Sequence, residues 1–94
     1  MGKFIDRHPA PDEIFLVIEV ANTTLETDRK QKAPLYAKGG IIDYWILDVN
    51  QRQVFVFREP GLETYNLEFI LQKDATLSSI AFPEIEIKIG KLFP

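Results

Sequence analysis

Two nearly continuous apolar runs dominate the hydrophobic pattern of this chain, at residues 14–20 and 41–47. Apolar side chains at successive positions, rather than at alternate ones, are typical of strands buried on both faces of a sheet. The pattern therefore predicts a first buried strand over residues 14–21 and a second over residues 41–47.

The segment between these runs has the signals of a helix. A polar break at residues 22–24 is rich in residues that cap helix starts, and Gly39-Gly40 suits a left-handed helix end. We therefore expect a helix from about residue 26 to residue 38. Pro34 lies inside it, lacks a backbone donor, and should either kink the helix or start a second one.

The rest of the chain shows the alternation of antiparallel or edge strands. Turn residues divide it into separate strands, and the first of these is expected to form a hairpin with the buried run before it. Strands are expected over residues 54–57, 65–71 and 85–89, separated by turns that include residues 48–51 and 60–61. The order of strand, helix and then several strands predicts an α/β fold with a mixed sheet and a flanking helix.

Length and composition limit the number of domains and the kinds of metal or catalytic site that the chain can form. The chain has 94 residues, which suits one domain, with residues 1–13 as an extended arm and 14–94 as the folded part. It has no cysteine, which excludes disulfides, thiolate metal sites and cysteine nucleophiles. His8 is the only histidine, so a zinc site built on several imidazoles is also excluded.

Charge gives a mixed indication about partners. The formal net charge of −3 argues against broad, non-specific binding to nucleic acid. Arg29, Lys30 and Lys32 nevertheless form a short basic cluster, for which a solvated helix face is the simplest interpretation. No stretch approaches the roughly 20 apolar residues of a membrane helix and no signal peptide is visible, so we expect a soluble, cytoplasmic protein.

Glu19 is the most unusual residue of the first apolar run. The other residues of positions 14–20 are all apolar, and burying an unpaired carboxylate costs several kcal/mol, at least roughly. Glu19 therefore needs either a charged partner or a metal ion, which makes it a candidate site residue. The alternative is that Glu19 ends the strand and reaches solvent or a nearby lysine.

Asp28 and Lys32 extend this candidate site. They are four residues apart on the expected helix, and Tyr36 follows four residues later, so all three lie on one face. Carboxylates together with a lysine are the raw material of a magnesium-dependent phosphodiesterase, in which the lysine orients water or offsets charge on the phosphate. The alternative is that Lys32 and Asp28 form an ordinary surface ion pair.

Three stretches of the chain together resemble a known family. They are PDEIFLVIEVANTT at residues 11–24, DRKQKAPLYA at 28–37 and GIIDYWILD at 40–48. They resemble the Uma-type family of putative restriction endonucleases, within the PD-(D/E)XK nuclease superfamily, and the resemblance extends from about residue 8 to residue 93. It implies a restriction-endonuclease-like mixed sheet, DNA as substrate, and Mg²⁺ or Mn²⁺ as cofactor.

The resemblance also implies roles for individual residues. Glu19 matches the second acidic metal ligand of the superfamily, whose lysine usually stands two residues later, where this chain has Ala21. Lys32 is therefore the expected substitute, and Asp28 the expected hydrogen-bond partner of Lys32 or of a metal-bound water. The family pattern assigns packing roles to three aromatic residues: Tyr36, Tyr44 and Trp45.

The first metal-binding aspartate of the superfamily is the missing part. Asp12 follows a proline as that aspartate does, but it precedes Glu19 by seven residues on one extended segment, which separates the two by about 23 Å. Two ligands of one magnesium ion lie within about 4–5 Å of each other. We therefore expect a domain that lacks its N-terminal helix and first strands and holds half of a metal site.

Two functional hypotheses follow. The first is a magnesium-dependent DNA endonuclease domain, truncated and weak or inactive on its own. The second is a catalytically silent nuclease relic that acts as an oligomerising or binding module. Under either hypothesis we expect a homodimer, because the edge of the Glu19 strand would be left without a partner.

Overall fold

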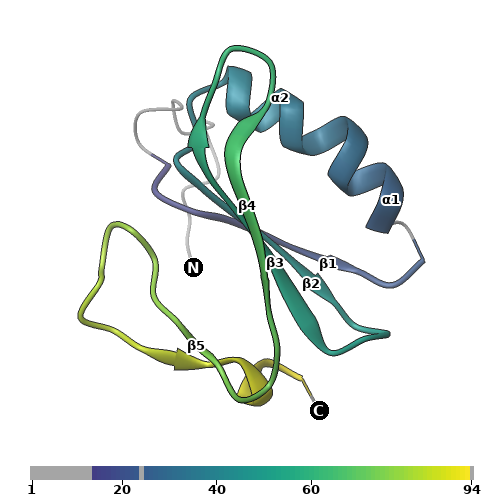
Figure 1. Cartoon of the computed structure of the whole chain (residues 1–94), viewed down its shortest axis with the longest axis vertical. Coiled ribbons are helices and arrows are strands. Elements are labelled where there is room, and N and C mark those ends of the chain that lie inside the picture. The colour runs from purple at the N-terminus through teal and green to yellow at the C-terminus, as the bar shows by residue number, and fades with distance from the viewer. Residues whose placement is uncertain (1–13, 24, 94) are drawn as a thin grey trace, which may run out of the picture.

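The computed structural model describes residues 14–23 and 25–93 and contains a four-stranded mixed sheet (Figure 1). The strand order is β1-β2-β3-β4; β1 and β2 are parallel, and the other neighbours are antiparallel. The strands are β1 (Val17–Ala21), β2 (Asp43–Asp48), β3 (Gln53–Pro60) and β4 (Tyr65–Leu71). The mixed sheet and the β2–β3 hairpin are therefore confirmed, and β1 forms one edge of the sheet.

A single helical stretch connects the two parallel strands. Its parts are α1 (Leu25–Thr27), a wide π-type turn (Asp28–Lys32) and α2 (Ala33–Lys38). The N–H of Ala33 donates to the carbonyl of Asp28, five residues back, which is the bond of the wider turn. Pro34 lies in the first turn of α2, where its missing N–H is best tolerated, so the predicted irregularity is a wide turn followed by a regular helix.

The predicted glycine end of the helix is confirmed. Gly40 has φ of +81°, in the left-handed region that favours glycine. The N–H of Ile41 donates to the Tyr36 carbonyl at 3.1 Å and that of Gly40 to the Ala37 carbonyl at 3.0 Å, which together form a Schellman cap. This cap turns the chain from α2 directly into β2.

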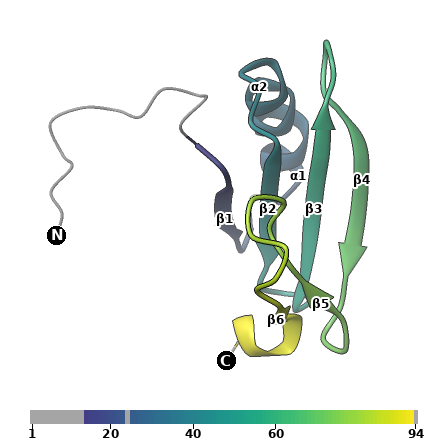
Figure 2. The same cartoon turned by 90° about the vertical axis from the view of Figure 1, so that its left-hand side faces the viewer.

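The helical stretch covers one face of the sheet, and the C-terminal segment lies against the other (Figure 2). On the helix side, the buried Tyr44, Ile46, Phe55 and Phe57 pack against the small side chains of the helix. Phe55 and Phe57 are thus core residues.

A second core cluster lies beneath the C-terminal segment. It contains Trp45, which is 1% exposed and is confirmed as a core residue, together with Val54 and Val56. The covering segment comprises β5 (Thr76–Leu77), β6 (Ile87–Lys88) and the 3-10 turn Ile89–Leu92. The predicted last strand over residues 85–89 is therefore shorter than expected and pairs with β5 in a separate two-stranded sheet.

The prediction that the first strand is buried on both faces was wrong. In β1, Glu19 and Ala21 face the helix, whereas Ile18 and Val20 on the other face are 49% and 66% exposed. The reason is the position of β1 at the sheet edge, because the C-terminal segment packs on β2 and β3 instead. A continuous apolar run does not distinguish an edge strand from a central one.

A buried carboxylate at the start of β2 ties the C-terminal segment to the sheet. Asp43 is fully buried and accepts hydrogen bonds from Trp45 Nε1 at 2.7 Å and Arg58 Nε at 3.0 Å. It also accepts one from the backbone N–H of Ile80 at 2.9 Å, while Arg58 donates to the carbonyl of Ser78. The loop that follows β5 is thereby attached to β2 and β3.

Candidate active site

Glu19 lies in the middle of β1, opposite Ile46 of β2 in the parallel register. Its side chain points toward the helix and is 21% exposed, so the carboxylate lies at the rim of the core. This position explains how a charged residue fits inside an apolar run: the carboxylate can reach polar groups on the helix and on β2.

Three donors surround the Glu19 carboxylate. The hydroxyl of Tyr36 donates to Oε2 at 2.7 Å, and the hydroxyl of Tyr44 donates to Oε1 at 3.1 Å. Lys32 Nζ lies 3.3 Å from Oε1. Each carboxylate oxygen therefore has at least one partner, which offsets the cost of partial burial.

The expectation that Tyr36 and Tyr44 serve only as packing residues was incomplete. Tyr44 is fully buried and stacks on Phe57 with a ring separation of 5.3 Å, so it does pack. Its hydroxyl, however, ends at Glu19, as does that of Tyr36. The sequence did give one indication of this role, because both positions hold tyrosine, whereas phenylalanine would be sufficient for packing in an apolar core.

Lys32 joins the two carboxylates of the candidate site. Its Nζ lies 3.3 Å from Glu19 Oε1 and 3.4 Å from Asp28 Oδ1, and the Asp28 side chain is only 6% exposed. Glu19 and Lys32, both candidate site residues from the sequence, therefore converge and form a direct ion pair. The structure brings together all three residues proposed from the sequence: Glu19, Asp28 and Lys32.

The contacts determine the charge states of the site. Burial alone would raise the pKa of Glu19, but the hydrogen bonds from Tyr36, Tyr44 and Lys32 outweigh it, and the pKa is lowered. The hydrogen bond to Glu19, followed by the attraction of its charge, raises the pKa of Lys32.

The two tyrosines remain protonated donors. Burial is the largest cause that raises the pKa of Tyr44, followed by the Glu19 charge, whereas the hydrogen bond to Glu19 is the largest cause for Tyr36. At neutral pH the site therefore contains a carboxylate, an ammonium and two phenol donors.

The other members of the basic cluster have separate partners. Arg29 binds Glu68 of β4 through two nitrogens, at 2.7 and 3.0 Å, and its guanidinium lies 4.9 Å from the ring centre of Phe55. Lys30 pairs with Glu26 at 3.4 Å on the exposed side of the helix. The interpretation as a solvated face holds for Lys30, whereas Arg29 ties the helix to the sheet and Lys32 belongs to the site.

The described donors do not by themselves fit a divalent cation. No group of three or more histidine, cysteine, aspartate or glutamate side chains gathers to hold a metal anywhere in residues 14–23 and 25–93. Both oxygens of Glu19 already accept hydrogen bonds, and the Lys32 ammonium contacts both Glu19 and Asp28. His8 and Asp12, which the sequence analysis considered, lie outside the described residues.

Comparisons with known proteins agree with this architecture. The model of the Uma2 family, described as "Putative restriction endonuclease", matches residues 2–90. A search of curated proteins finds no match. The fold is similar to that of the crystal structure of a "putative nuclease belonging to DUF820" from Anabaena variabilis, with a TM-score of 0.61 and 23% identity.

That similarity covers 82% of this chain and 42% of the Anabaena chain. The present chain thus spans less than half the length of its structural relative. Among the described residues, no helix has the length and apolar character needed to cross a membrane.

Proposed function

The chain belongs to the Uma2 family of putative restriction endonucleases, and we propose that it contributes the Glu19–Lys32 part of a DNA endonuclease active site. The observation that supports this most directly is the convergence of Glu19, Lys32 and Asp28 on the helix-covered face of β1. Family membership supports phosphodiester hydrolysis as the reaction and DNA as the substrate.

The described side chains suit charge stabilisation around a phosphate. Lys32 is held ionised between two carboxylates and is 46% exposed, so its ammonium can reach a phosphate oxygen or orient a water molecule. Asp28 fixes the position of Lys32, and the two tyrosine hydroxyls fix the position of Glu19.

Mg²⁺, or Mn²⁺ in its place, is the cation that we propose for this site. A hard cation with oxygen ligands would neutralise charge on the phosphate during hydrolysis. Glu19 would be its one ligand within the described residues, and at least one further carboxylate must come from elsewhere, either from the same chain or from another.

We therefore expect the isolated chain to show no robust nuclease activity. A single carboxylate holds a divalent cation weakly, so the phosphate would lack most of its charge stabilisation. The measurement is incubation of pure protein with supercoiled plasmid and Mg²⁺ or Mn²⁺, followed by electrophoresis. Cleavage that disappears in Glu19→Ala would contradict the expectation and would show that the site is complete in this chain.

A second measurement distinguishes an incomplete site from no site. Mn²⁺ broadens the NMR signals of nuclei near it, so a Mn²⁺ titration should broaden the amides around Glu19 and Lys32 first. The broadening should weaken in Glu19→Gln and persist in Glu63→Gln, which changes an exposed carboxylate on the β3–β4 turn. Equal broadening in both variants would remove Glu19 from the proposed metal site.

A catalytically silent binding or oligomerising module is the second candidate function. The observation that favours it is the exposed outer face of β1, where Ile18 and Val20 are 49% and 66% exposed. Among the described residues, β1 pairs with β2 alone, so its other edge offers backbone groups to a further strand.

The same observation leads us to propose a homodimer. Pairing of two copies along β1 would cover both the apolar side chains and the open strand edge, and two-fold symmetry is the commonest arrangement. Light scattering coupled to size exclusion at micromolar concentration should give twice the chain mass of 10.8 kDa. A monodisperse particle at the chain mass would refute the dimer.

A further inference from the structure

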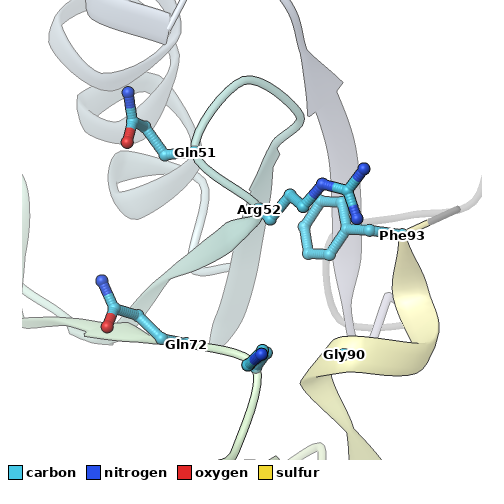
Figure 3. Close-up of a pocket in the computed structure, with 6 residues that line it drawn as sticks. Gln51, Arg52, Gln72, Gly90 and Phe93 are labelled. Carbon is cyan, nitrogen blue, oxygen red and sulfur yellow. The ribbon is translucent and has the colours of Figure 1, made fainter.

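A cavity of about 380 Å³ lies apart from the Glu19 site, where the β2–β3 turn meets the C-terminal segment (Figure 3). None of the residues that contact Glu19 lines it. Its lining comes from three separate segments and comprises Gln51, Arg52, Gln72, Lys73, Gly90 and Phe93. In Figure 3 the Arg52 side chain extends toward Phe93, on the side of the cavity formed by the C-terminal segment.

The two cations of this cavity have no neutralising partner among residues 14–23 and 25–93. Arg52 and Lys73 are both exposed, and within that part of the chain no carboxylate lines the cavity and neither cation has an ion-pair partner. The basic residues near the helix and the Asp43 network behave differently, because each has a carboxylate within 4 Å. They are Arg29, Lys30, Lys32 and Arg58. In a protein of net charge −3, two free cations in one concave site favour an anionic ligand.

A hydrogen-bond chain holds two sides of the cavity together. Asp48, which is buried, accepts from the backbone N–H of Gln51 at 3.3 Å and from Gln53 Nε2 at 3.1 Å. Gln53 Oε1 in turn accepts from Gln72 Nε2 at 3.2 Å. The β2–β3 turn and the end of β4 are therefore fixed relative to each other before any ligand binds.

A close backbone contact attaches the third side. The N–H of Gly90 donates to the carbonyl of Lys73 at 3.2 Å. A Cβ at position 90 would lie 3.2 Å from that same oxygen, which is tighter than most such contacts, so the neighbouring backbone would have to shift slightly. Glycine at position 90 thus allows the C-terminal segment to approach Lys73 closely enough to form the cavity wall.

The backbone of Arg52 has a conformation that glycine or asparagine would adopt with less strain. Its φ of +53° lies in the left-handed region, where glycine and asparagine are favoured and most other residues are strained. Residues with such strained backbone conformations cluster at active sites and ligand-binding sites. It also provides a useful variant, because Arg52→Gly removes the cation while relieving the backbone.

The cavity lies within a limited distance of Glu19, although Glu19 faces the helix and the cavity lies on the side of the C-terminal segment. The N–H of Val49 donates to the carbonyl of Ala21 at 3.1 Å, so the β2–β3 turn adjoins the carboxyl end of β1. Only two residues separate Glu19 from this hydrogen bond, and three separate it from Arg52. The Cα atoms of Glu19 and Arg52 are therefore at most about 25 Å apart. A strand of about eight nucleotides would cover that distance.

We propose that this cavity binds a phosphate group of a polynucleotide strand. Arg52 and Lys73 supply the charge that attracts the phosphate, and Phe93 supplies an apolar wall suited to the attached sugar or base. The choice of a polynucleotide rather than free phosphate rests on the proposed endonuclease function. The phosphate chemistry itself rests only on the cavity.

The test is an NMR titration of the whole chain in low salt with a chelator, so that no metal-dependent cleavage occurs. The two probes are inorganic phosphate alone and a single-stranded DNA of about 12 nucleotides. The amide signals of Arg52, Lys73 and Gly90 should move saturably with both probes, and DNA should bind at least about tenfold more tightly because it contacts further groups.

Variants separate this site from general charge attraction. Arg52→Gly and Lys73→Ala should each weaken DNA binding about fivefold to tenfold. Lys38→Ala is the matched control, because Lys38 is exposed, lies outside the cavity and has no ion-pair partner among the described residues. It should weaken DNA binding less than about twofold. In Glu19→Gln the three cavity amides should still move, so this result does not depend on the proposed active site.

Two outcomes would overturn the proposal in full: no saturable change at the three amides with either probe, or an equal loss of DNA binding in Lys38→Ala and Arg52→Gly. If inorganic phosphate bound as tightly as DNA, the phosphate site would be supported and the polynucleotide assignment overturned. Failure of the endonuclease proposal would appear elsewhere, in the Mn²⁺ titration at Glu19.

Discussion

Replacing Asp43 with alanine is expected to lower the free energy of unfolding by about 3–5 kcal/mol. Asp43 is fully buried, and its removal would leave the guanidinium of Arg58, which is only 19% exposed, without its counter-charge. Trp45 Nε1 and the backbone N–H of Ile80 would lose their acceptor at the same time. Since small domains are stable by only about 5–15 kcal/mol, this loss would remove a large part of the stability and lower the melting temperature.

Urea unfolding followed by circular dichroism measures this change. Asp74→Ala is the matched control, because Asp74 is an exposed aspartate and its removal should change stability by less than about 0.5 kcal/mol. Asp43→Asn should lie between the two, since an amide keeps an acceptor but removes the charge. Loss of less than about 1 kcal/mol in Asp43→Ala would show that the network contributes little.

A double variant identifies the source of the loss. If the unpaired guanidinium is responsible, Arg58→Met combined with Asp43→Leu should recover part of the stability, because both charges are then absent. If the loss came only from the broken link to Ile80, the second substitution would recover nothing. The comparison therefore separates electrostatics from the attachment of the C-terminal segment.

The parts of the fold that depend on local sequence could be predicted. Gly39-Gly40 specified the helix end because only glycine adopts the left-handed cap at low cost, and the alternation over residues 65–71 identified β4. The exposure of Ile18 and Val20 could not be predicted, because it depends on which segment covers that face of the sheet. Asp43 was missed because two of its partners, Arg58 and Ile80, are distant in sequence.

Part of the candidate site could likewise be predicted from the sequence, and part could not. Asp28 and Lys32 are one helical turn apart, so their pairing follows from helix geometry. Glu19 could be identified as the one carboxylate of an apolar run. The tyrosine hydroxyls reach Glu19 across 17 and 25 residues of chain, and no local pattern shows where a phenol oxygen will end. A tyrosine that only packs and a tyrosine that also donates a hydrogen bond cannot be distinguished from the sequence alone.

Removing those hydroxyls should raise the pKa of Glu19, and each tyrosine should contribute separately. A hydrogen bond to a charged group favours the ionised form, and the Glu19 carboxylate is only 21% exposed, so water replaces the lost donors incompletely. Tyr36→Phe and Tyr44→Phe leave the burial, which raises the pKa, but each removes a donor that lowers it. The double variant should show the sum.

The same change affects stability as a function of pH. Because folding lowers the pKa of Glu19 below its ordinary value of 4.5, the ionised carboxylate stabilises the fold above that pH. This contribution is lost as the pH falls through the lower pKa of the folded state. In the double variant, where the folded pKa is higher, the stabilisation should be smaller at neutral pH and should disappear at a higher pH than in the wild type.

The Glu19 side-chain carboxyl ¹³C shift, followed by NMR between acid and neutral pH in a chelating buffer, measures this pKa directly. Its signal is assigned by its absence in Glu19→Gln. Tyr65→Phe is the matched control: it removes a hydroxyl from the same aromatic cluster, but that hydroxyl donates to the carbonyl of Ile41 and does not contact Glu19. The control should leave the Glu19 titration unchanged. A Glu19 pKa that stays at the wild-type value in the double variant would show that Lys32 alone keeps the carboxylate ionised, and that the two tyrosines contribute packing rather than positioning.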